Sequence, residues 1–126
     1  MTDFAPDLPT AADAIDLADR VVGTAIRRLA TLDGGADRHQ VFAYDIAHAA
    51  AAVATAKSML DYGGKGDDEA RITCAYVADT VHDVAGKLFG REDLWGVAPD
   101  ALDGTREFVA RFRAPEFLAS LADRPG

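Results

Sequence analysis

Cysteine, methionine and tryptophan are scarce in this chain of 126 residues, which contains one Cys, two Met and one Trp. A single cysteine cannot form a disulfide within the chain, and Cys74 falls on an apolar helix face, where we expect a buried structural thiol. The acidic start Met1-Thr2-Asp3 is not followed by an apolar signal segment. No run approaches the roughly 20 apolar residues of a membrane-spanning helix. We therefore expect a cytoplasmic protein with no membrane partner.

Basic residues are also few, because 13 Lys and Arg stand against 21 Asp and Glu, for a net charge of −8. Nucleic acids and anionic membrane surfaces are bound through basic patches, so this balance argues against both as partners. The length is that of one domain. Although 49% of the residues are hydrophobic, many of them are alanine, which buries little area, and we expect a thin core.

No strand pattern occurs, and the most regular stretch, residues 37–90, has apolar residues at alternating steps of three and four. The first apolar series is Phe42, Ile46, Ala49, Val53, Ala56 and Leu60, and the second is Ala70, Cys74, Val77, Val81, Val84 and Leu88. Reflection about position 65 superposes the two series, as expected for two helices that fold back on each other. The sequence therefore predicts an all-α fold, an antiparallel helical hairpin within a four- to five-helix bundle.

Proline and glycine suggest the remaining boundaries. We expect residues 1–9 to lie loose, residues 10–123 to form the bundle domain, and residues 124–126 to be a linker-like end. Thr10 is predicted to open the first helix and Gly34-Gly35 to end it. A helix is expected to begin at Pro99 or Asp100, and Pro115 to open a last short helix.

The hairpin helices carry their own start and stop signals. Asp37, with Gln40 three residues later, is predicted to cap the first hairpin helix, and Asp67 to cap the second. Gly63 is predicted to end the first of them as a left-handed cap.

Asp45 with His48 and Asp79 with His82 repeat the carboxylate and histidine spacing found in metal-binding helical bundles. At about 100° per residue, however, the two histidines point to opposite flanks of the hairpin, and they cannot share an ion. We expect no metal site here.

Other candidates also favour a structural interpretation. The Gly-rich residues 62–66 lack the spacing of a phosphate loop and precede three acidic residues, so we expect a plain turn. Trp95 is expected to fill the core, and Arg106, Arg111 and Arg113 to lie on a solvated helix face. No motif for a nucleophile or an acid–base pair is present, and we expect no catalytic residue.

Several segments resemble the acyl-CoA dehydrogenase family. They are residues 42–50 (FAYDIAHAA), 60–66 (LDYGGKG), 90–97 (GREDLWGV), 108–110 (FVA) and 117–119 (FLA), which are similar to a helical segment at the amino end of some actinobacterial members. Gln40, Ile46-Ala47-His48, Val53 and Lys57 also resemble the carboxy-terminal helical domain of the family. The family's flavin-contacting arginine motif, its catalytic glutamate and its β-domain have no counterpart in this chain.

The resemblance implies an accessory or oligomerisation domain of an FAD-dependent acyl-CoA dehydrogenase-like oxidoreductase, not catalytic by itself. Its partner would be a second copy or the catalytic core, a homo-oligomer is expected, and FAD would belong to the parent enzyme. Two alternatives stay open. The chain is a stand-alone helical interaction module, or it contributes to flavin or acyl-CoA binding at a subunit interface, with Gln40 as the candidate residue.

Overall fold

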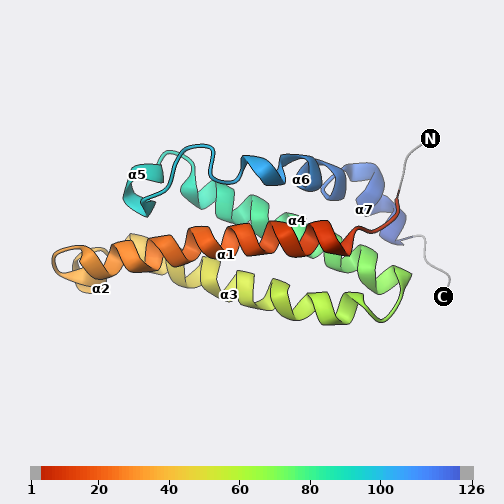
Figure 1. Ribbon diagram of the computed structural model, residues 1–126, viewed down its shortest axis with the longest axis horizontal. Coiled ribbons are helices and arrows are strands. Elements are labelled where there is room, and N and C mark those ends of the chain that lie inside the picture. Colours follow the sequence, from red (N-terminus) through yellow and green to blue (C-terminus); the bar gives the residue numbers. More distant parts are fainter. Residues whose placement is uncertain (1–3, 123–126) are drawn as a thin grey trace.

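The computed structural model describes residues 4–122, which form helices and no strand (Figure 1). The elements are α1 (Leu8–Thr31), α2 (Gly35–Arg38), α3 (Gln40–Gly63), α4 (Asp67–Leu88), α5 (Glu92–Trp95), the 3-10 turn η1 (Asp103–Thr105), α6 (Arg106–Phe112) and α7 (Pro115–Ala122). The all-α prediction is confirmed, and the long helices pack side by side as a bundle.

The helical hairpin is formed by α3 and α4, and α1 packs against both of them. Every residue of the predicted apolar series on α4 is buried, and on α3 only Leu60 is partly exposed. The hydroxyl of Thr73 on α4 donates to the carbonyl oxygen of Met59 on α3 at 3.0 Å, which ties the two helices together near their turn. The apolar spacing therefore identified the buried faces of both helices correctly.

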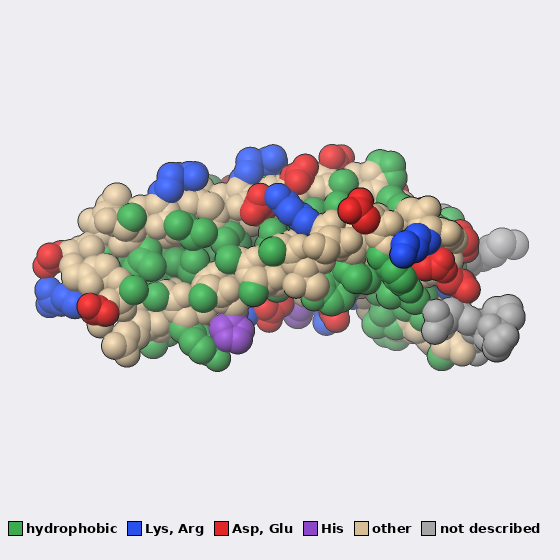
Figure 2. All heavy atoms as spheres, turned by 90° about the horizontal axis from the view of Figure 1, so that it is seen from below, with side chains coloured by type: hydrophobic (Ala, Val, Ile, Leu, Met, Phe, Trp, Pro, Cys, Tyr) green, Lys and Arg blue, Asp and Glu red, His purple; other side chains and the backbone are tan. Residues whose placement is uncertain are grey.

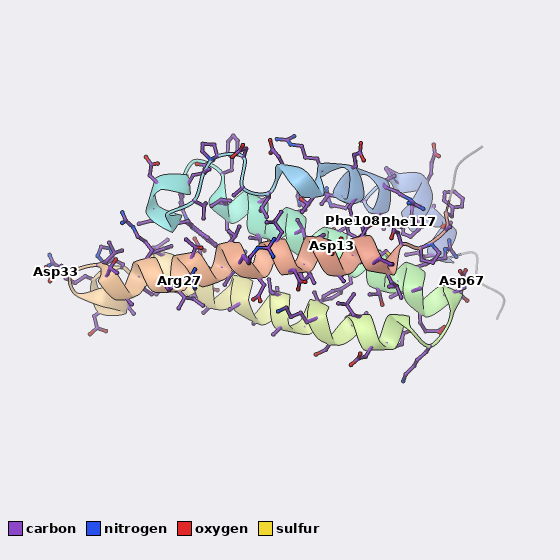
Figure 3. The ribbon with its side chains drawn as sticks, in the orientation of Figure 1. Asp13, Arg27, Asp33, Asp67, Phe108 and Phe117 are labelled. Carbon is purple, nitrogen blue, oxygen red and sulfur yellow. The ribbon has the colours of Figure 1, made fainter. Side chains whose placement is uncertain are left out.

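The segments α6 and α7 pack against α4 on the side away from α3, and α5 packs against α1 (Figure 1). Trp95 is fully buried, with its ring centre 6.0 Å from that of Phe42, which confirms it as a core residue. Phe108 and Phe117 point inward toward the start of α1 (Figure 3), and both rings contact Phe112, at 4.8 and 4.9 Å between ring centres.

The first helix begins at Leu8, two residues before the predicted start, because Asp7 and not Thr10 is its cap. The carboxylate of Asp7 accepts hydrogen bonds from the backbone N–H of Thr10 at 3.1 Å and from its hydroxyl at 2.8 Å. Pro9 fits the first turn, where its missing N–H is not needed. The predicted end at Gly34-Gly35 is also late, since α1 ends at Thr31.

Residues 4–9 are not loose, contrary to the expectation for residues 1–9. The ring of Phe4 lies 6.3 Å from that of Phe117, and its carbonyl accepts a hydrogen bond from Arg71 Nε at 3.1 Å. The carbonyl of Ala5 accepts another from Arg111 at 2.6 Å. Residues 1–3 and 123–126, including the predicted linker-like end, lie outside the described part of the chain.

The predicted caps of the hairpin are wrong. Asp37 lies inside the separate short helix α2, and α3 begins at Gln40 with His39 as a cap that makes no side-chain hydrogen bond. Asp67 is the first residue of α4, preceded by Gly66. Gly63 is the last residue of α3 and not a left-handed cap; the turn is closed by hydrogen bonds from the N–H groups of residues 64 and 65.

Past the hairpin, α4 ends at Leu88, and α6 begins at Arg106 instead of Pro99 or Asp100. The intervening residues form α5, a loop and η1, in which Gly96 has a φ of 77°. Pro115 opens α7 as predicted.

Candidate functional site

The two histidines of the apparent metal motif are exposed, and each has a different neighbourhood. His48 stacks on Tyr44, one turn earlier on α3, with 4.3 Å between ring centres. His82 lies on α4 at the edge of a cavity shared with α6. In the described part of the chain, the pockets that His82 lines are not lined by His48.

The carboxylates of that motif bind arginines from other parts of the fold. Asp45 accepts a hydrogen bond from Arg91 at 2.7 Å, and Asp79 accepts one from Arg113 at 3.0 Å. These ion pairs connect the hairpin to the segments that follow it. Within residues 4–122, no group of three or more Asp, Glu, His or Cys side chains could hold a metal ion.

Of the Gly-rich residues 62–66, the first two end α3 and residues 64–66 form the predicted turn, with three acidic residues directly behind it in the first turn of α4. The expected solvated group of arginines is confirmed only in part. Arg106 and Arg113 are exposed, but Arg111 is half-buried, with its guanidinium 4.7 Å from the ring centre of Phe112. Because Arg111 also donates to the carbonyl of Ala5, it holds the amino-terminal segment against α6.

Gln40, the candidate cofactor contact, is exposed at the start of α3. Its side-chain amide donates to the carbonyl oxygen of Asp37 at 3.4 Å. The charged neighbours Arg38 and Arg91 are paired with acidic residues of this chain, and the nearby Phe42 ring is buried. The role of Gln40 as a contact for flavin or acyl-CoA stays a prediction.

The most unusual surface is the side of α3 that faces away from α1 and α4. We call it the α3 outer face. Its members share exposure to solvent and the lack of a charge, and they lie within about 60° of Ala51 on the helical wheel. They are Gln40, Tyr44, Ala47, His48, Ala51, Ala54, Thr55, Ser58 and Tyr62.

Large hydrophobic side chains gather around this face. Val41 and Tyr44 are 66% and 65% exposed at its amino end, and Tyr62 lies at its carboxyl end. On α1, Asp19 binds Lys57 of α3, and the exposed Ile26 lies two helical turns farther along the same side of α1. On α4, the exposed Tyr76 shares a surface depression with Ala52 of α3. Ile26 and Tyr76 therefore add exposed hydrophobic side chains on both sides of α3. Charged residues lie beside them, Asp19 with Lys57 on the α1 side, and Asp79 and Asp83 in the depression on the α4 side.

The outer side of α1 shows the usual pattern of a surface helix. Asp13 and Arg27 stand on the solvent side of α1 (Figure 3). The view onto the α3 side instead shows hydrophobic and uncharged surface across its middle, with charged side chains along both edges and at both ends (Figure 2). A helix that is apolar on all sides is normally buried on all sides. In the described part of the chain, nothing covers the α3 outer face.

The sequence contains a signal for this face that the helix pattern did not reveal. No charged residue occurs between Asp45 and Lys57, three turns of helix, whereas a surface helix carries charges on its outer side. Alanine fills most of that interval, and alanine is compatible with a solvated helix as well as with a contact. Only the exposure of the bulky residues at its edges distinguishes the two cases.

A second feature is the cavity between α4 and α6, with a volume of about 430 Å³. Its floor is apolar and includes Val81, Leu88 and Val109. Phe89, which is 86% exposed, forms one wall, and His82 lies on the rim. This volume and lining are in the range of sites for small apolar ligands.

Cys74 is fully buried, as expected, and its Sγ accepts a hydrogen bond from the backbone N–H of Asp7 at 3.3 Å. Burial in apolar surroundings raises the pKa of the thiol, because the thiolate is poorly solvated there. The thiol is therefore a core group that holds the start of α1 against α4.

No helix within residues 4–122 combines the length and apolarity needed to cross a membrane. Comparisons of the chain with protein-family models, with curated proteins and with solved structures gave no match. Within the described residues, the α3 outer face is the strongest candidate site.

Proposed function

We propose that this chain is a helical oligomerisation domain that works by contact and not by catalysis. The observation that carries the proposal is the α3 outer face, which is exposed, uncharged and flanked by Ile26 and Tyr76. A chain of net charge −8 repels its own copies, so association is favoured where charge is absent. The resemblance to acyl-CoA dehydrogenases supplies the wider proposal that the domain serves an FAD-dependent enzyme of that type, which would hold the FAD itself.

The size of the face sets the expected strength of association. The helix α3 is about 36 Å long and about 10 Å wide, so it contributes on the order of 400 Å² per copy. Stable complexes bury about 800 Å² per partner. Even with side chains of α1 and α4 added, the buried area remains at the low end of the range for protein interfaces. We therefore expect dissociation constants of roughly micromolar order.

Sedimentation equilibrium and light scattering across micromolar to millimolar concentration test the proposal. We expect a monomer that reversibly forms a dimer. Ala51→Glu and Ala51→Lys place a charge of either sign at the centre of the face, and both should shift the dissociation constant upward by at least about tenfold. Ala119→Glu, an exposed alanine on α7, is the matched control and should have no effect. A wild-type chain that stays monomeric at millimolar concentration would refute self-association.

A second candidate function is ligand binding in the α4/α6 cavity, which the apolar floor and the exposed Phe89 favour. An acyl chain would be suited to this lining, and the likeness to acyl-CoA dehydrogenases makes it the first probe. Titration with a fluorescent fatty acid should then show saturable binding that Ala85→Trp abolishes by filling the cavity. The flavin alternative is tested separately by the absorbance spectrum of the purified chain, which would show a flavin band if the cofactor were retained.

A further inference from the structure

Large and small side chains are unequally distributed along the α3 outer face. The amino-terminal half carries Gln40, Tyr44 and His48. The carboxy-terminal half carries Ala54, Thr55 and Ser58, followed by Tyr62 at its end. Ala51 lies in the middle, where a second backbone can approach closely. The face is therefore bulky from residue 40 to 48, flat at the centre and shallow from residue 54 to 58, with Tyr62 at the far end.

From this distribution we infer that two copies pair through α3 in antiparallel orientation, with the two-fold axis beside Ala51. The inference rests on the proposed self-association and adds its geometry. At 1.5 Å per residue, Tyr44 of one copy then lies at the height of Ser58 of the other. His48 lies at the height of Ala54, so large side chains meet small ones on both sides of the axis. Only at the two ends of the contact do two large side chains, Gln40 and Tyr62, lie at the same height.

A parallel pair would place each residue beside its own copy. Tyr44 would then meet Tyr44, while the alanines at positions 51 and 54 would face each other across a gap that the bulky residues hold open. Asp61, exposed at the edge of the face, would also meet its own copy, at a cost in like-charge repulsion. The antiparallel arrangement instead brings Asp61 to the height of the uncharged Val41.

The neighbouring helices are consistent with an axis at Ala51. Asp19 of α1 binds Lys57 of α3, so the two residues lie at the same height. Two turns farther along α1 is Ile26, and two turns back along α3 is Ala50, which places these two at a similar height. Tyr76 lies beside Ala52. Both exposed side chains therefore lie close to the proposed axis. Asp45 and Lys57, which lie on α3 to either side of the face, are engaged within the chain, Asp45 with Arg91 and Lys57 with Asp19. Neither ion pair has to be broken for the copies to meet.

The orientation is tested by engineered cysteines, since the native Cys74 is fully buried and should not react in the folded protein. Ala51→Cys places the new thiol on the proposed axis, and mild oxidation should link two copies through it. Ser58→Cys is the matched control on the same face. In the antiparallel pair it lies about 21 Å along the helix from its own copy, so it should not link by itself. Mixed with Tyr44→Cys, it should form a disulfide between the two variants.

Each outcome decides between the alternatives. If Ser58→Cys links to itself as readily as Ala51→Cys, the pairing is parallel and the inference is wrong. If the wild-type chain dimerises but Ala51→Cys does not link, the contact lies elsewhere and the proposed geometry fails while self-association stands. If the wild-type chain is monomeric by sedimentation, the proposed function fails first. Ala119→Cys, on α7, reports the background of random collisions.

Discussion

Gly63 of α3 lies so close to Thr73 of α4 that a methyl group on the glycine would be 2.9 Å from the threonine hydroxyl oxygen. The same methyl would be 3.0 Å from Cδ2 of Leu8 on α1. Gly63 is thus the point where the three long helices come together. The Thr73 hydroxyl cannot move aside freely, because it also donates to backbone carbonyls of both hairpin helices.

Gly63→Ala should therefore destabilise the fold by about 1–3 kcal/mol, the usual cost of overpacking a close contact. Urea unfolding followed by circular dichroism gives this value. Gly86→Ala is the matched control, because Gly86 is exposed within α4 and a methyl there meets no atom within 4 Å. It should stabilise the protein by about 0.5–1 kcal/mol through helix propensity. Equal effects of the two substitutions would show that the Gly63 contact is not tight.

Arg71 joins the two ends of the described chain. Its guanidinium donates to the carbonyl of Phe4 and to the hydroxyl of Ser120, and it lies 5.6 Å from the ring centre of Phe117. With a side chain only 13% exposed, Arg71 is shielded from water, so its hydrogen bonds to neutral groups matter more than a surface ion pair.

We expect Arg71→Ala to cost about 2 kcal/mol and to release the segment before α1. The measurement is native-state amide exchange at Asp7, whose N–H is bound to Cys74 Sγ and should exchange much faster in the variant. Arg106→Ala serves as the control, since Arg106 is 79% exposed and pairs with Asp103 only one turn away. An unchanged exchange rate at Asp7 would mean that Arg71 does not hold the segment.

Asp7 should make the stability depend on pH in a defined direction. The hydroxyl and backbone N–H of Thr10 donate to its carboxylate, and these hydrogen bonds lower the pKa of Asp7 in the folded protein. A carboxyl group with a lowered folded pKa contributes its full stability above the unfolded pKa, near 4, and loses it as the pH falls through the lower folded value.

Asp7→Asn tests this contribution, because asparagine is also a good helix cap but does not titrate. At pH 7 the two proteins should be nearly equally stable, whereas below about pH 4 the wild type should lose stability relative to the variant. Asp7→Ala removes the cap at every pH and should cost about 1 kcal/mol. If the difference in unfolding free energy between the wild type and Asp7→Asn is constant from pH 2 to pH 7, the carboxylate does not have the proposed role.

Val53 and Val77 lie in the seam between α3 and α4, with 2% and 0% of their surface exposed. Val53→Asp or Val77→Asp would bury an unpaired charge, and we expect a loss of more than about 4 kcal/mol, enough to unfold the domain. Far-ultraviolet circular dichroism at 25 °C shows the loss of helix. Ala51→Asp, on the exposed side of the same helix α3, should leave the helix content unchanged.

The sequence predicted the long helices well because their signal is local and periodic. Phe42, Ile46 and Val53 recur at helical spacing, and each is buried. The same reasoning misplaced the caps, because a cap depends on which side chain reaches the helix end. Asp7 gains that role in a segment that Arg71 and Arg111 hold in place from 67 and 106 residues away.

For the Asp–His motif, too, local spacing predicted the side of the helix but not the partners. The wheel directed His48 and His82 to different sides of the hairpin, but their carboxylate neighbours found partners that no spacing rule names: Asp45 binds Arg91 across 46 residues and Asp79 binds Arg113 across 34.

The sequence by itself determined that the chain is helical and which side of each hairpin helix is buried, because apolar periodicity acts within a few turns. Only the tertiary structure decided that no part of residues 4–122 covers the other side of α3, since that depends on where α1 and the segments after α4 pack. It also determined that Gly63 serves close helix contact instead of a turn, because the approach of Leu8 and Thr73 is set by three helices together.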